Sequence, residues 1–275
     1  MFNYEFMQVA FIVGIMLSVV IPLIGNTVVF KGLSMTGDAL SHTALAGVAI
    51  GLIAGVNPLI TAIIASVISA FLIEIIRKKF YKYSEIAIAI VLSLGIGLAG
   101  VLSSFAPAAN FNSYLFGSII AISSLEVYIT IGLFAIVVLS SVLFYKELMF
   151  ISYNENNARL AGVPVNFVNF IFTLLTALTV AIASRTIGAL IVSSLMVVPV
   201  ATALQVSKSY KATIIKSVMF SMLSVCLGLI VSFYQGLKPG GTIVLISIVF
   251  LILAMLFKLL IKQIEKHHKH EHVAI

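Results

Sequence analysis

The sequence predicts an all-α integral membrane protein that crosses a bilayer eight or nine times. Of its 275 residues, 61% are hydrophobic and only 9% are charged, and the mean hydropathy is +1.22. Apolar runs of about 20 residues, the length that a spanning helix needs, follow one another along the chain. These three observations exclude a soluble domain with a large core.

Nine apolar runs are long enough to span, and each ends at charged residues, prolines, glycines or polar residues. The predicted spans are, in order, Val9–Phe30, Asp38–Val56, Leu59–Ile76, Ile86–Phe105, Val127–Tyr145, Val165–Ser184, Ile187–Val206, Ala212–Tyr234 and Gly241–Leu260.

Two elements are less regular than these runs. Tyr114–Ile122 lies in a mixed, serine-rich section and is predicted to be a short interfacial or re-entrant helix. Pro199 interrupts Ile187–Val206, and broken backbone is tolerated in a membrane only against protein or a water-lined cavity. The count of eight or nine depends on whether this run crosses fully.

The basic residues predict the orientation of the chain. With nine alternating spans and the C-terminus in the cytoplasm, only Arg185 and Lys238 of the 16 Lys and Arg fall outside, which leaves 14 inside. Because the basic bias normally decides topology, the N-terminus is expected outside the cell. The net charge of +7 is therefore attributed to cytoplasmic loops that face anionic lipid, and no nucleic-acid partner is expected.

The chain is interpreted as one transmembrane domain, 1–261, followed by a tail, 262–275. No Pro/Gly/Ser linker and no period of 20–50 residues divides it. No cleavable signal is evident before the first span, since Glu5 is the only charge there. Cys226 is the single cysteine, so no disulfide framework exists.

Asp38 and His42 are the main candidate site. Asp38 is the only aspartate, and His42 is the only histidine before the tail. Four residues apart on a helix, they lie on one face with Cβ atoms about 5–6 Å apart. Carboxylate and imidazole suit Zn²⁺ or Mn²⁺, and two ligands bind weakly, as a translocation pathway requires. The alternative is structural: Asp38 caps the second span, and His42 is a hydrogen-bonded interior histidine.

The longest polar stretch before the tail, residues 146–164, is the second candidate. Asn154 can cap a short helix, and Gly162 followed by Pro164 can end it. Such a helix parallel to the membrane can dock a partner on the cytoplasmic side. An ordinary solvated connection is the alternative.

The tail is a third candidate, because a histidine-rich tract can bind divalent transition metals. Its histidines are His267, His268, His270 and His272. The alternative is a solvated basic end that binds metals without selectivity.

Enzyme classes are poorly supported. The chain has no phosphate-binding loop and no His-Glu-x-x-His, so ATP hydrolysis would need a separate subunit. A single aspartate excludes a two-aspartate intramembrane protease. Ser41 and His42 are adjacent, so their side chains point to different helix faces.

Gly32–Ala49, which reads GLSMTGDALSHTALAGVA, resembles the signature of membrane permeases in bacterial ABC importers for zinc and manganese. Tyr114–Ser118 and Ile187–Ala203 are further similar segments, and the resemblance runs nearly the full length. It implies a fold related to the cobalamin and iron-siderophore permeases, without their first helix.

The resemblance also implies partners: a homodimer of permeases, two cytoplasmic ATPase subunits that bind the ATP, and an external metal-binding protein. By this resemblance Asp38 and His42 are the pathway metal ligands. Glu155, Ala158 and Gly162 belong to the ATPase-docking helix. The metal is transported as substrate, and no permanently bound cofactor is expected.

Zinc is favoured over manganese because Tyr114–Gly117 and Gly188–Ile191 look closer to the zinc branch and because the histidine tail suits zinc. Manganese or iron import by the same family is the first alternative. A proton-coupled secondary transporter with Asp38 and His42 as its relay is another. A non-transporting membrane sensor that detects metal with its tail is the last.

Overall fold

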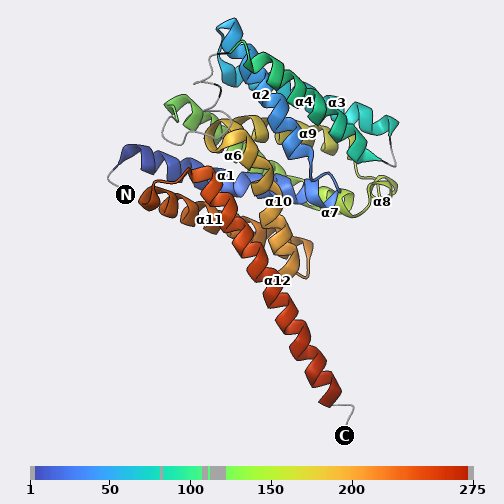
Figure 1. Ribbon diagram of the computed structural model, residues 1–275. Coiled ribbons are helices and arrows are strands. Elements are labelled where there is room, and N and C mark those ends of the chain that lie inside the picture. Colours follow the sequence, from blue (N-terminus) through green and yellow to red (C-terminus); the bar gives the residue numbers. More distant parts are fainter. Residues whose placement is uncertain (1–3, 81–82, 107–110, 112–121, 272–275) are drawn as a thin grey trace.

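The structure of the protein is a computed structural model that describes residues 4–80, 83–106, 111 and 122–271, and its regular elements within these ranges are all helices (Figure 1). In chain order they are α1 (Glu5–Phe30), α2 (Thr36–Ala54), α3 (Pro58–Lys79), α4 (Ser84–Ser103), α6 (Ser124–Leu143), α7 (Tyr145–Tyr153), α8 (Glu155–Leu160), α9 (Val165–Ala183), the π-helix η2 (Ser184–Gly188), α10 (Ala189–Val206), α11 (Tyr210–Gln235) and α12 (Pro239–Glu271).

Eight helical segments of the described chain are long and apolar enough to cross a membrane. They correspond to eight of the nine predicted spans, and the ninth, in α10, has a shorter apolar stretch, Ile191–Val206. The prediction of eight or nine spans in an all-α membrane protein is therefore confirmed. The predicted short helix Tyr114–Ile122 falls almost wholly on residues 112–121, outside the described residues.

The core lies along α1 and α10, which run through the middle of the bundle (Figure 1). Leu17, Ile21 and Ile24 of α1 and Leu195 and Met196 of α10 are fully buried. Gly25 packs directly on the backbone carbonyl of Met196, so the missing side chain lets the two helices approach closely.

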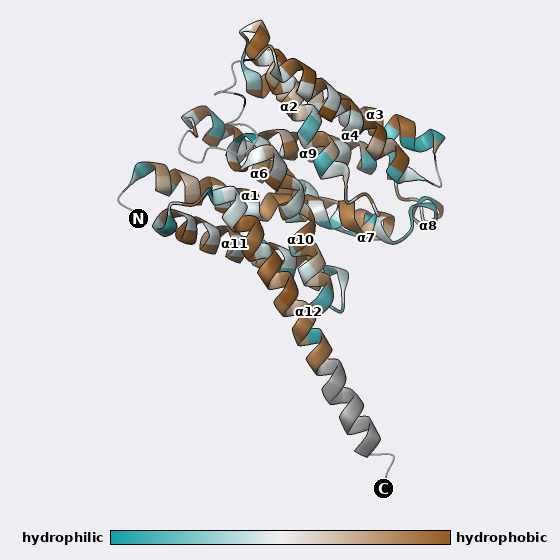
Figure 2. Ribbon diagram, viewed as in Figure 1, coloured by the Kyte–Doolittle hydropathy of each residue, from teal (hydrophilic) through white to brown (hydrophobic). Residues whose placement is uncertain are grey.

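The outer helices expose apolar residues, as a bilayer requires. Ile60, Ile64, Ile68 and Ile75 of α3 are each more than half exposed and follow a helical period, so they form one apolar face. Figure 2 shows hydrophobic residues along α3, α4 and α12, with hydrophilic residues gathered near helix ends.

The predicted interruption of Ile187–Val206 at Pro199 is wrong, whereas a break does occur near the predicted boundary between this span and Val165–Ser184. α10 continues through Pro199, so the proline does not interrupt it. The interruption comes earlier, where α9 passes into the π-helix η2 and Gly188 takes φ 101°. Side chains disfavour such a φ strongly, whereas glycine adopts it freely, so Gly188 separates α9 from α10. A proline removes only one helical hydrogen bond, and neighbouring helices can support the rest.

The polar stretch 146–164 folds into two short helices, α7 and α8. Asn154 accepts a hydrogen bond of 3.0 Å from the Asn157 N–H and thereby caps α8. Gly162 takes φ 82° just after α8 ends. The predicted cap and stop are confirmed, whereas the helix α7 before them was not anticipated.

Two further boundaries differ from the prediction. α6 begins at Ser124, three residues early, because Ser123 and Glu126 form a reciprocal capping box. α12 does not end at Leu260 but continues to Glu271 into the predicted tail. Lys and Glu are good helix formers, and nothing between 260 and 271 breaks a helix.

Candidate functional site

Asp38 and His42 lie on one face of α2, as their spacing predicts. Asp38 Oδ1 is 3.8 Å from His42 Nε2, and the two side chains are 30% and 20% exposed. Met35 is the N-cap of α2, with no side-chain capping bond, and Asp38 falls inside the first turn. The alternative that Asp38 caps this helix is therefore wrong, which leaves its carboxylate free for other partners.

Ser193 of α10 joins this pair. Its hydroxyl donates a hydrogen bond of 3.3 Å to Asp38 Oδ1. The approach depends on Gly37, where a Cβ would lie 3.2 Å from Met196 Sδ and 3.4 Å from Ser193 Cα. On the other side of α2, a Cβ on Gly95 of α4 would lie within 3 Å of the residue after His42. The site thus lies between α2 and α10, with α4 packed on α2 beside it.

These groups form a sparse donor set: one carboxylate, one imidazole and one hydroxyl. Among the side chains that the structure describes, no third His, Cys, Asp or Glu stands close enough to complete a metal site. Structural zinc sites use four protein ligands, whereas an ion in transit must be released. The arrangement suits brief coordination of a divalent ion and does not suit permanent storage.

The predicted docking residues occupy different environments on α8 and after it. Ala158 is fully buried, so it packs α8 onto the chain. Gly162 is exposed and has open space around its Cα. Leu160, which the sequence did not single out, is 87% exposed and is the most prominent apolar side chain of this region.

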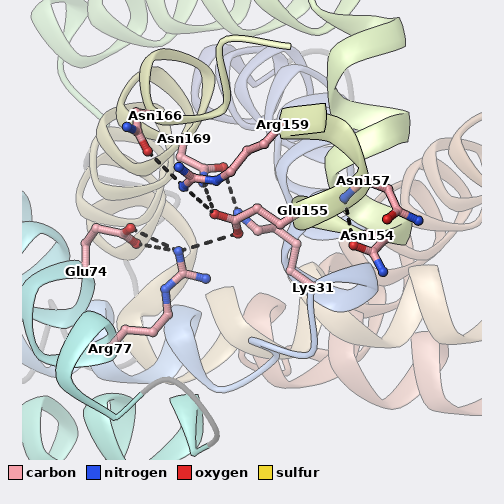
Figure 3. A network of polar contacts seen from close by, with 9 residues as sticks. All are labelled: Lys31, Glu74, Arg77, Asn154, Glu155, Asn157, Arg159, Asn166 and Asn169. Atoms are coloured by element: carbon pink, nitrogen blue, oxygen red, sulfur yellow. Dashed lines mark hydrogen bonds and ion pairs between the residues drawn. The ribbon is translucent and has the colours of Figure 1, made fainter. Parts of the chain in front are cut away.

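Glu155 lies at the centre of a polar network that joins α8 to three other helix ends (Figure 3). Its carboxylate is 3.1 Å from Arg159, 4.0 Å from Arg77 of α3, and accepts a hydrogen bond of 3.4 Å from Asn169 of α9. Lys31, just after α1, donates to Asn169 Oδ1 over 2.8 Å. The sequence could not reveal this grouping, since its members are far apart in the chain.

The pKa values of two residues in the network are shifted by their surroundings. Burial lowers the pKa of Lys31 to about 8, with the neighbouring Arg77 charge adding to the effect. Burial alone would raise the pKa of Glu155. The hydrogen bond from Arg159 and the charges of Lys31 and Arg77 outweigh it and hold that pKa below its usual value. Glu155 is therefore ionised at neutral pH.

A second ion pair was not anticipated from the sequence. Arg185 Nε of η2 is 2.9 Å from Glu126 Oε1 at the start of α6, and the side chains are 18% and 11% exposed. This pair lies at the break between α9 and α10. The sequence could not reveal this pair, because Glu126 and Arg185 lie far apart in the chain.

The histidines of the tail belong to the end of α12. His267, His268 and His270 lie on its helical backbone, and His272 is outside the described residues. Their role as a metal tract stays a prediction.

Comparison with known proteins places the chain in a group of metal transporters. Residues 3–258 match the ABC 3 transport family. The manganese transport system membrane protein MntC of Listeria monocytogenes is 32% identical over 257 residues, covering 93% of this chain and 91% of the relative. The high-affinity zinc uptake system membrane protein ZnuB of Haemophilus influenzae is 32% identical over 260 residues, covering 93% and 98%.

A solved structure, PsaBC from Streptococcus pneumoniae in complex with Fab, contains a chain that superimposes with a TM-score of 0.81. It is 30% identical in sequence, and the match covers 92% of this chain and 91% of that one. Both the family match and the fold extend over almost the whole length. This chain is a member of the ABC 3 transport family.

Proposed function

We propose that this protein is the membrane permease of an ATP-driven importer of a divalent metal ion, with Zn²⁺ as the cargo. The single observation that carries the proposal is the group formed by Asp38, His42 and Ser193 between α2 and α10. An ionisable pair within a membrane-spanning helix is costly and marks an ion path by default.

The ion path lies between two copies of the chain. Asp38 and His42 remain 30% and 20% exposed in one chain, so the pair opens to a surface and not to an enclosed cavity. A second copy facing this surface would close the path around the ion. An external metal-binding protein delivers the ion to one side of this homodimer.

Two cytoplasmic ATPase subunits supply the energy, since the chain has no phosphate-binding loop of its own. They dock on α8 through its exposed side, with Gly162 and Leu160 facing the partner and Ala158 holding the helix to the bundle. ATP binding and hydrolysis move α8, and this motion switches the side to which the path opens. The N-terminus lies outside the cell and the C-terminus inside, as the basic residues predict.

Zinc is proposed over manganese on ligand chemistry. The relatives do not separate the two metals, because the manganese and zinc proteins are both 32% identical to this chain. Imidazole favours zinc, whereas carboxylate serves both ions. His42 is therefore the residue on which the choice of metal depends. Its replacement by Glu is expected to lower zinc uptake while retaining manganese uptake.

The test measures cellular zinc and manganese by elemental analysis in metal-starved cells that lack this chain. The cells are complemented with wild type, Asp38→Ala or the matched control Glu85→Ala, an exposed glutamate at the start of α4, each at equal membrane expression. Wild type and Glu85→Ala are expected to restore zinc, and Asp38→Ala is expected to fail while still binding the ATPase.

Each other outcome has a distinct meaning. Restoration of manganese alone would retain the mechanism and overturn the cargo. Normal zinc uptake by Asp38→Ala would remove Asp38 from the path. Uptake that persists in cells without the partner ATPase would favour a proton-coupled transporter.

A further inference from the structure

The carboxylate of Glu155 faces the chain's own helix ends, although Glu155 belongs to the proposed docking helix. The side chain is 29% exposed, compared with 48% for Arg159. Its oxygens are occupied by Arg159, Asn169 and Arg77, all of this chain (Figure 3). Few of its acceptor positions remain for a partner protein.

One branch of the network leads from Glu155 to the turn before Asp38. Asn169 bridges the branch, because its Nδ2 donates to Glu155 and its Oδ1 accepts from Lys31. Lys31 follows the last residue of α1, and α2 begins at Thr36, so the connecting turn is short.

The turn itself is held by backbone hydrogen bonds. Gly32 takes φ 69°, the Leu33 N–H donates to the Val28 carbonyl over 2.9 Å, and the Thr36 N–H donates to the Leu33 carbonyl over 2.9 Å. A displacement of Lys31 is therefore transmitted to the first turn of α2, which carries Asp38.

A second branch leads from Glu155 to α3. Arg77 lies 4.0 Å from Glu155 and 2.9 Å from Glu74, so it connects α8 with the end of α3. α3 packs tightly on α2, since a Cβ on Gly47 would lie 2.6 Å from the Thr61 carbonyl oxygen. Both branches therefore converge on α2.

The network borders open space in which its side chains can rearrange. A small cleft is lined by Lys31, Arg77 and Asn169 together with Thr36 and Leu40 of α2. Thr36 and Leu40 each stand two residues before Asp38 and His42, about 200° around the helix. The cleft is thus on the opposite side of α2 from the metal-binding pair and is not the ion path.

We propose that Glu155 is a positioning residue: it transmits the displacement of α8 to Asp38 through Asn169 and Lys31 and through Arg77, and it is not a contact to the ATPase. The inference rests on the proposed function and deepens it, since it names the route by which the docking helix controls the site. Arg77 and Asn169 take part in the same route, and neither lies on α8.

The experiment uses the complete importer, with its ATPase and external binding protein, reconstituted in proteoliposomes. Zn²⁺ is supplied in the outside solution. Zinc uptake and ATP hydrolysis are measured together, and co-purification with the ATPase is measured beforehand. Glu155→Gln keeps the shape and removes the charge. We expect uptake per ATP to fall by at least about fivefold, the lower end of coupling between distant sites, with co-purification unchanged.

Asn169→Ala provides a second variant, because it leaves Glu155 in place and removes the bridge to Lys31. It is expected to lower uptake per ATP less than Glu155→Gln does, because the branch through Arg77 remains. The double variant is expected to be no worse than Glu155→Gln alone. Glu85→Gln, an exposed glutamate outside the network, serves as the matched control and is expected to keep the wild-type ratio.

Two results would overturn the inference. Loss of co-purification in proportion to loss of uptake would show that Glu155 is a docking contact. An unchanged ratio of zinc uptake to ATP hydrolysis in both variants would show that the route does not exist. A wild-type complex without ATP-dependent uptake would instead refute the proposed function itself. If the wild-type complex takes up zinc and both Glu155→Gln and Asn169→Ala keep its uptake per ATP, the route is refuted while the proposed function stands.

Discussion

The hydroxyl of Ser193 donates a hydrogen bond of 3.3 Å to Asp38 Oδ1, although the two residues are 155 positions apart in the chain. This bond connects α2 with α10, the helix that begins at Ala189 directly after the π-helix η2. π-helical turns inside α-helical segments are frequent at functional sites. The position of Asp38 is therefore sensitive to any movement of α10.

Ser193→Ala removes this hydrogen bond and is expected to raise the KM for zinc uptake roughly fivefold, the equivalent of about 1 kcal/mol for one hydrogen bond. Ser193→Thr retains a hydroxyl and should stay closer to wild type. The measurement is initial zinc uptake in proteoliposomes. Ser194→Ala, one residue further along α10, is the control, and equal KM values for the two alanine variants would contradict the role of Ser193.

Gly162→Ala places a side chain at φ 82°, a left-handed conformation that costs about 1–2 kcal/mol for a residue with a Cβ. The expected result is a lower melting temperature and weaker recovery of the ATPase in a pull-down. Gly97→Ala tests the effect of the methyl group alone, because Gly97 also has open space around it and lies within α4. If both variants recover the ATPase equally, the turn after α8 does not matter for docking.

Arg185→Met leaves Glu126 without its ion-pair partner at a site where both side chains are less than one-fifth exposed. Removing one member of a buried pair costs about 3–5 kcal/mol, so the melting temperature of the purified permease should fall by several degrees. The double variant Arg185→Met with Glu126→Leu is expected to recover part of this loss. Glu5→Gln, an exposed carboxylate in α1, should leave the melting temperature unchanged.

The lowered pKa of Lys31 predicts that stability depends on pH. Its pKa is lowered from 10.5 to about 8 by burial, so between these values the folded protein binds fewer protons than the unfolded chain. Stability must then increase as the pH rises through this window. The difference in melting temperature between wild type and Lys31→Met is expected to shift in favour of wild type from pH 7.5 to pH 10. A difference that is constant with pH would show that Lys31 titrates normally.

The sequence was sufficient to predict the spans and the local chemistry, because these depend on neighbouring residues. Apolar runs of sufficient length marked the membrane helices, and the spacing of four placed Asp38 and His42 on one face. Asn154 and Gly162 have strong local preferences, for a cap and for a positive φ, and both were recognised correctly.

The features that the sequence did not predict depend on contacts between segments that are distant in the chain. Ser193 reaches Asp38 only because Gly37 allows α10 to approach α2. Arg185 meets Glu126 across two helices. Pro199 was predicted to interrupt its span, yet α10 is continuous through it, and the helical path changes at Gly188 instead.

The length of α12 determines where its histidines can act. With 33 residues and a rise of about 1.5 Å per residue, the helix measures about 50 Å, whereas the hydrocarbon layer is about 30 Å thick. Roughly 20 Å of continuous helix therefore extends into water, directed away from the bundle (Figure 1). Because a helix is stiff, it keeps the backbone positions of His267, His268 and His270 away from Asp38 and His42, the proposed ion path. If the tail histidines bind metal, as predicted, that binding is therefore expected to be independent of any ion at Asp38.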